Sequence, residues 1–231
     1  MSRAVTVAPV VAIDGPSGSG KGTISRAVAS RVGWHWLDSG ALYRLVALAG
    51  SAAGLDPQDV PGHARAALAM RVVFDLDTHD SERVVLDGAD VTAAVRSEAA
   101  GQGASRVAAW PAVRDALLER QKAFARAPGL VADGRDMGTV VFPDARLKVF
   151  LTASAAARAE RRYKQLKDKG SGVSLAALSR EIAERDLRDT TRAVAPLRPA
   201  SDAHVIDSTD LSIDEVVERV LALGRSRSLW K

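Results

Sequence analysis

The chain has 231 residues, of which 47% are apolar and 26% charged, a balance typical of globular proteins and not of disordered ones. It contains no cysteine, which excludes disulfides, thiolate metal sites and cysteine nucleophiles. The net charge of +4 is uneven, because residues 146–199 carry 13 Lys and Arg against 6 Asp and Glu.

The first fifty residues predict alternating strands and helices. Residues 8–14 are apolar and β-branched and lead into glycine, which indicates a buried strand, and residues 21–32 are typical of a helix. A short strand is expected at 34–37, followed by a helix through about residue 52. This order is a βαβ unit and predicts a parallel sheet. The first apolar run, 7–13, is too short to span a bilayer.

The middle of the chain breaks this pattern. Residues 71–76, 83–86 and 89–91 alternate apolar and polar side chains at period two. We therefore expect a small antiparallel sheet, inserted at roughly 66–98 into a parallel α/β core. Further elements are expected beyond it: helices at 100–109, 111–125, 155–166, 174–192 and 213–223, and strands at 130–132, 147–151 and 204–206.

The strongest local signal is the segment GPSGSGKGT at 15–23, placed after a strand and before a helix. Glycines let the backbone curl so that successive N–H groups point at an anion, and the helix N-terminus favours the same anion. Lys21 is expected to reach the β- and γ-phosphates of a nucleotide, and Thr23 to ligate Mg²⁺. Gly22 stands where the general motif has Ser or Thr, a form that resembles nucleoside monophosphate kinases.

Two further segments lie at the expected carboxyl ends of strands, where open α/β sheets bind ligands. In LDSGALYR, at 37–44, Ser39 could cap a helix or touch a ligand, and Arg44 could pair with a phosphate. In ADGRDMGT, at 132–139, Arg135 offers a planar fork for a phosphate. Asp136 offers an acceptor for an exocyclic amine such as that of cytosine. Asp133 is either an outer acceptor for magnesium or a loop cap.

The basic tract places arginines at helical spacing. Arg158, Arg161 and Arg162 share one helix face, and Arg185, Asp189 and Arg192 share another. Two such helices could form a flap that closes over a transferring phosphoryl group and excludes water. The alternative is an exposed charged hairpin without a ligand.

These segments together resemble the bacterial cytidylate kinases, and the resemblance covers nearly the whole chain. It is carried by five segments: GPSGSGKGT at 15–23, LDSGALYR at 37–44, SRVAAWPAVR at 105–114, ADGRDMGTVVFPDA at 132–145 and ERDLRDTTRAVAPL at 184–197. The resemblance implies one kinase domain with the three-layer α/β fold of P-loop nucleoside monophosphate kinases. It also implies a nucleotide-binding insert at roughly 66–98 and a helical lid at roughly 155–192.

The resemblance further implies ATP and CMP or dCMP as substrates, Mg²⁺ as cofactor, and a cytoplasmic monomer that binds neither nucleic acid nor membrane. The residues expected on the ATP side are Gly15, Pro16, Ser17, Gly18, Ser19, Gly20, Lys21, Gly22, Thr23, Arg158, Arg161 and Arg162. Those expected around CMP are Ser39, Tyr43, Arg44, Ser105, Arg114, Arg135, Asp136, Arg185, Asp189 and Arg192. Lys21, Arg135 and Arg162 are the expected catalytic residues.

Three alternatives remain at this point. The first is a P-loop kinase for UMP, AMP or a non-nucleotide substrate, and the second is a nucleotide sensor without activity. The third is a nucleic-acid-binding protein that uses the basic tract, which lacks interleaved aromatic residues. An assay of ADP release across the nucleoside monophosphates separates them.

Overall fold

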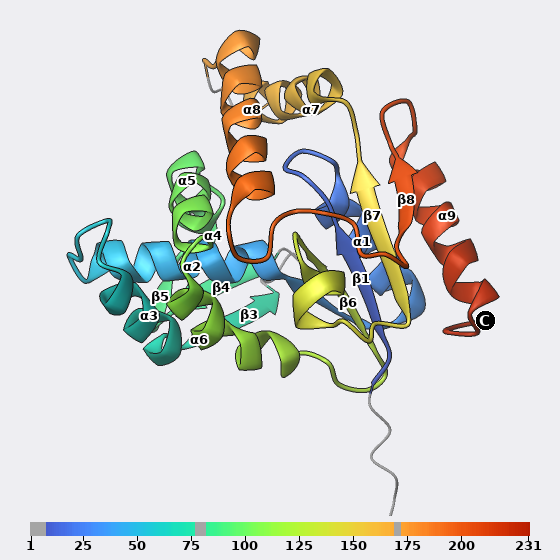
Figure 1. Ribbon diagram of the computed structural model, residues 1–231, viewed down its shortest axis with the longest axis horizontal. Coiled ribbons are helices and arrows are strands. Elements are labelled where there is room, and N and C mark those ends of the chain that lie inside the picture. Colours follow the sequence, from blue (N-terminus) through green and yellow to red (C-terminus); the bar gives the residue numbers. More distant parts are fainter. Residues whose placement is uncertain (1–7, 77–81, 169–171) are drawn as a thin grey trace, which may run out of the picture. The chain divides into compact units, whose positions relative to one another are not determined.

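The computed structural model describes residues 8–76, 82–168 and 172–231, and Figure 1 shows them as a ribbon. The chain divides into two compact units. The first unit comprises residues 1–38 and 122–231, and the second comprises residues 39–121. Residues 77–81 of the predicted insert and residues 169–171 of the predicted lid lie outside the described residues.

A five-stranded parallel sheet forms the centre of the first unit, as the sequence predicts. Its spatial order is β2-β6-β1-β7-β8, and each neighbouring pair is parallel. The strands are β1 (Val10–Asp14), β2 (His35–Asp38), β6 (Leu130–Gly134), β7 (Leu147–Thr152) and β8 (His204–Asp207). β1 lies in the middle, so the loop after it leaves from the centre of the sheet.

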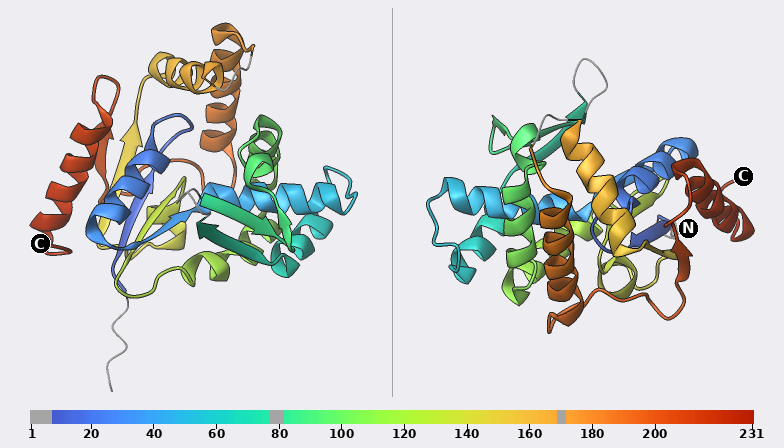
Figure 2. Two further views of the ribbon diagram at one scale, coloured as in Figure 1. Left: turned by 180° about the vertical axis from the view of Figure 1, so that it is seen from behind. Right: turned by 90° about the horizontal axis from the view of Figure 1, so that it is seen from above.

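Side-chain alternation along β1 assigns its two faces. Val11 and Ile13 are fully buried in one apolar cluster with residues of α1 (Lys21–Val32) and α9 (Ile213–Ser226). Asp14 points to the opposite face, where the short π-helix η1 (Met137–Val141) begins. α9 begins at a capping box formed by Ser212 and Glu215. The views in Figure 2 show α1 and α9 beside the sheet.

Two helices between β7 and β8 carry the basic tract. α7 (Ala155–Lys167) begins at Ser154, whose hydroxyl accepts from the Ala157 N–H. α8 (Leu175–Thr191) begins in the same way at Ser174. Serine caps of this kind satisfy donors that a helix start otherwise leaves unpaired. The predicted helices at 155–166 and 174–192 are thus confirmed within two residues.

The second unit combines helices with the predicted antiparallel sheet. The sheet has the order β3-β4-β5 and contains β3 (Val72–Leu76), β4 (Glu82–Leu86) and β5 (Ala89–Asp90). The helices are α2 (Ser39–Ala52), α3 (Val60–Ala69), α4 (Thr92–Val95), α5 (Glu98–Val107) and α6 (Pro111–Lys122). α3 was not expected from the sequence. None of the helices in the described part of the chain has the length and apolar character needed to cross a bilayer.

Candidate active site

The phosphate loop connects β1 to α1, as predicted. Gly15 allows the loop to pass close to β7, because a Cβ atom there would lie 2.1 Å from the Leu151 carbonyl oxygen. Gly20 precedes α1 in the left-handed region, at φ 90°, where glycine is strongly favoured. The Lys21 ammonium donates to the Pro16 carbonyl oxygen at 3.2 Å and so folds back along the loop.

Lys21 lies in a group of charges at the carboxyl ends of β1, β2 and β6. Loss of hydration lowers the pKa of Lys21 to about 7, and the positive charges of Arg135 and Arg185 act in the same direction. Burial, together with the negative charge of Asp38, raises the pKa of Asp133 to about 8. Trp36 donates to Asp133 at 3.3 Å. The negative charge of a bound polyphosphate would stabilise the charged form of this poorly hydrated ammonium.

Arg135 and Asp136 form the turn between β6 and η1, and an aspartate from β1 holds the first residues of η1. Both carboxylate oxygens of Asp14 accept backbone N–H bonds at 2.8 Å, one from Met137 and one from Gly138. Asp14 is only 5% exposed, and burial raises its pKa to about 6. The carboxylate therefore ties the start of η1 to the centre of the sheet.

The predicted residues of α8 meet this turn. Arg135 donates to Asp189 at 2.8 Å, and Arg192 lies 3.8 Å from the Asp136 carboxylate. Burial alone would raise the pKa of Asp189, but the charge and hydrogen bond of Arg135, with the charges of Arg185 and Arg192, hold it below its usual range. Five of the predicted CMP-side residues are thus brought together within the first unit.

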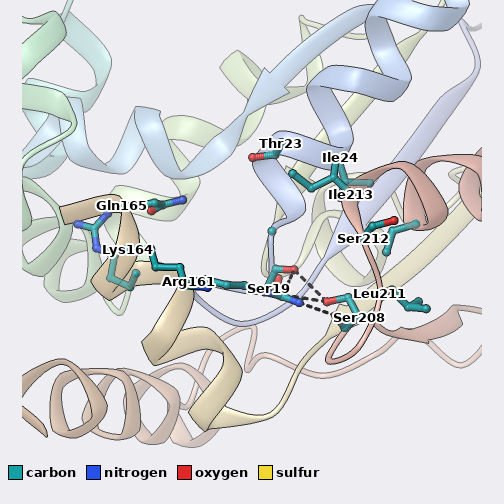
Figure 3. A pocket seen from close by; sticks show the side chains of 14 residues that line it. Ser19, Thr23, Ile24, Arg161, Lys164, Gln165, Ser208, Leu211, Ser212 and Ile213 are labelled. Carbon is teal, nitrogen blue, oxygen red and sulfur yellow. Dashed lines mark hydrogen bonds between the residues drawn. The ribbon is translucent and has the colours of Figure 1, made fainter. Parts of the chain in front are cut away.

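The predicted ATP side contains a cavity of about 300 Å³ next to the phosphate loop. Figure 3 shows Arg161 reaching across it toward Ser19 and Ser208. The lining residues are Gly18, Ser19, Gly20, Thr23, Ile24, Arg161, Arg162, Lys164, Gln165, Ser208, Leu211, Ser212, Ile213 and Val216. The volume and the mixture of apolar wall and cationic rim suit a nucleotide base with its phosphates.

Arg158, expected on the ATP side, is held by protein groups, and its contact with ATP stays a prediction. Its side chain is 6% exposed and donates to the carbonyl oxygens of Ala153 and Ser17, each at 3.0 Å, and to the Asp186 carboxylate. The guanidinium group therefore supports the outside of the phosphate loop. Asp186 was missed at the sequence level, although it lies three residues before Asp189 on α8 and so shares a helix face with a residue that was predicted.

The remaining predicted residues lie in the second unit. Ser39, Tyr43 and Arg44 belong to α2, Ser105 to α5 and Arg114 to α6. The Arg114 guanidinium lies 5.9 Å from the centre of the Tyr43 ring, a cation–π distance. Arg44 donates to the Val95 carbonyl oxygen at 2.9 Å. Tyr43 and Arg114, far apart in sequence, are thus neighbours, and their contact with CMP stays a prediction.

A divalent ion would find few protein ligands here. Among the described residues there is no group of three His, Cys, Asp or Glu side chains placed to hold a metal. Thr23, in the first turn of α1, lines the cavity and presents a hard oxygen donor. This donor set fits Mg²⁺, which commonly takes one or two protein oxygens and otherwise binds water and substrate phosphates.

Comparisons with known proteins show to which family the chain belongs. Over 217 residues the chain is 58% identical to the cytidylate kinase of Pseudomonas fluorescens (strain Pf0-1), covering 94% of this chain and 95% of that protein. It is 56% identical to the cytidylate kinase of Methylococcus capsulatus (strain ATCC 33009 / NCIMB 11132 / Bath), covering 94% and 97%. A gluconokinase structure from Sinorhizobium meliloti 1021 is similar at a TM-score of 0.47 and 18% identity, covering 95% and 93%. The model of the family described as "Cytidylate kinase" matches residues 11–226. The chain therefore belongs to the cytidylate kinase family.

Proposed function

We propose that the protein transfers the γ-phosphoryl group of ATP to the phosphate of CMP or dCMP, giving ADP and CDP or dCDP. One observation carries the proposal: Asp14 and Gly134 are register partners in the neighbouring parallel strands β1 and β6, so the phosphate loop with Lys21 and the turn with Arg135 begin side by side. Lys21 and Arg135 are thus placed so that one can bind the donor phosphates of ATP and the other the acceptor phosphate of CMP.

The chemistry needs positioning more than proton transfer. The nucleophile is a phosphate oxygen that is already anionic, so no general base is required. Lys21 neutralises charge on the donor phosphates, and Arg135 and Arg162 neutralise charge on the moving group and the acceptor. Mg²⁺, held by Thr23 and the donor phosphates, would withdraw charge from the same group.

Base selection is assigned to Asp136, with Ser105 and Arg114 as further predicted contacts. The Asp136 carboxylate accepts from the cytosine amino group. Uracil would present a carbonyl oxygen to the same carboxylate, and two acceptors that face each other cannot form a hydrogen bond. We assign Ser39, Tyr43, Arg44, Arg185, Asp189 and Arg192 to the sugar and phosphate of the acceptor. A cytoplasmic monomer stays a prediction from the sequence.

The test is an ADP-release assay with ATP and Mg²⁺ against CMP, dCMP, UMP and AMP. We expect turnover with CMP and dCMP well above that with UMP and AMP. Preference for UMP or AMP would replace the proposal with another nucleotide kinase. Salt-sensitive oligonucleotide binding without turnover would favour the nucleic-acid alternative.

A further inference from the structure

Two arginines of α7 hold the phosphate loop from outside. Arg158 donates to the carbonyl oxygen of Ser17 at 3.0 Å, and Arg161 donates to that of Ser19 at 3.4 Å. The two arginines are three residues apart and therefore lie on one helix face. Between the two carbonyls, a Cβ atom at Gly18 would lie 3.1 Å from the Cβ of Arg158. Residues 17–19 of the phosphate loop therefore pack directly against α7.

The geometry of a phosphate cradle explains why such donors are needed. When successive backbone N–H groups converge on an anion, the carbonyl groups between them point away from it. Carbonyl oxygens that are removed from water need a hydrogen-bond partner. Arg158 and Arg161 provide these partners, so they act on the shape of the loop and not only on its charge.

Arg158 is in turn held by α8. Its two terminal nitrogens face the two carboxylate oxygens of Asp186, one at 3.0 Å, in the paired arrangement that fixes a guanidinium plane. Its Nε atom donates to Ala153, just after β7. One buried guanidinium therefore joins the phosphate loop, the end of β7 and helix α8.

We propose that Asp186 is a positioning residue for ATP binding, which acts through Arg158 on the Ser17 carbonyl without touching ATP. The proposal deepens the function proposed above, since it concerns the same ATP site. Without the Asp186 carboxylate, the Arg158 fork is no longer fixed in plane, and the outward carbonyl of Ser17 loses its oriented donor. The cradle then becomes less ordered before ATP arrives, and ATP must order it on binding.

The test compares Asp186→Asn with Glu184→Gln, which removes a charge from an exposed position on the same helix. Binding of a non-hydrolysable ATP analogue is measured by calorimetry, and KM is measured for ATP and for CMP. We expect Asp186→Asn to weaken analogue binding and raise the KM for ATP by about tenfold, the effect of one charge-assisted hydrogen bond. The KM for CMP should change by less than about twofold, because the substitution removes no residue that is predicted to contact CMP. Glu184→Gln should match the parent enzyme.

A double-mutant cycle with Arg158→Lys then tests whether Asp186 affects ATP binding through Arg158. If Asp186 acts through Arg158, the double variant should bind the analogue no more weakly than Arg158→Lys alone. Additive losses would overturn the proposal. So would a variant that loses thermal stability but keeps normal analogue binding, or one that loses CMP and ATP affinity equally. Absence of turnover with CMP in the parent enzyme would refute the proposed function, while the analogue measurements would still decide the role of Asp186.

Discussion

The buried pair of Arg135 and Asp189 should show an asymmetric response to mutation. Asp189 lies near three guanidinium groups. The charges of Arg185 and Arg192, like that of Arg135, lower its pKa. Asp189→Asn would leave three neighbouring cations without this carboxylate. Arg135→Gln, in contrast, would leave the carboxylate with two cations. We therefore expect Asp189→Asn to be the more destabilising change.

The structure sets the scale of this effect. The side chains of Arg135 and Asp189 are 16% and 8% exposed, so the pair is largely removed from water. Removing one partner of a buried pair costs about 3–5 kcal/mol, and the partial exposure of Arg135 favours the lower end. For a chain of this length, about 3 kcal/mol corresponds to a fall in melting temperature of about 6–12 °C.

Differential scanning calorimetry of the nucleotide-free protein measures the effect. Asp214→Asn serves as the control, because Asp214 also pairs with an arginine, Arg31, but the two side chains are 85% and 43% exposed. Its loss should cost less than about 1 kcal/mol. The reasoning would be refuted if Asp189→Asn were as mild as the control, or if Arg135→Gln were the more damaging of the pair.

The same geometry makes three further predictions. Lys21→Met should abolish turnover while leaving the melting temperature close to that of the parent, and near-normal rates would show that the loop does not hold the donor phosphates. Asp136→Ala should lower the preference for CMP over UMP far more than it lowers ATP affinity, and an unchanged ratio in the ADP-release assay would contradict the base-selection role. Burial raises the pKa of Asp14 to about 6. Between about pH 4 and 6 the folded protein therefore holds a proton on Asp14 that the unfolded chain has lost. Because of this difference, the free energy of unfolding declines as the pH rises through this window. The free energy of unfolding of the parent relative to Asp14→Asn, from urea titrations, should fall by on the order of 3 kcal/mol across this window, whereas parallel curves would refute it.

The sheet and the phosphate loop could be predicted because their signals are local. β1 is a run of apolar residues, and the glycine pattern of residues 15–23 specifies both a curled backbone and a helix start. Period-two alternation likewise identified the antiparallel sheet. Helix α3 was missed because Pro61 and Gly62 argue against a helix by propensity. Its start is set instead by Asp59, which accepts from the Gly62 N–H, and by proline in the first turn, where it is tolerated.

Other features depend on contacts between distant segments, which periodicity does not report. η1 begins where Asp14, 123 residues earlier, accepts the N–H of Met137. Spacing placed Arg158 on the same helix face as Arg161, but not its contact with the Ser17 carbonyl 141 residues away. Residue type and helix face could be predicted, whereas the partner could not, because an arginine can donate to phosphates, to carboxylates and to carbonyl oxygens.

This versatility explains why arginine, and not lysine, stands at position 158. A lysine ammonium is a compact point charge at the end of a flexible chain, whereas a guanidinium is a rigid plane with five donors. Only the plane can place donors on Ser17, Ala153 and Asp186 at once. A phosphate loop built mainly from glycine and serine has little side-chain packing of its own to hold its shape. Its order must therefore come from neighbouring elements, and the buried arginine of α7 supplies that order while Lys21 remains available for the phosphates.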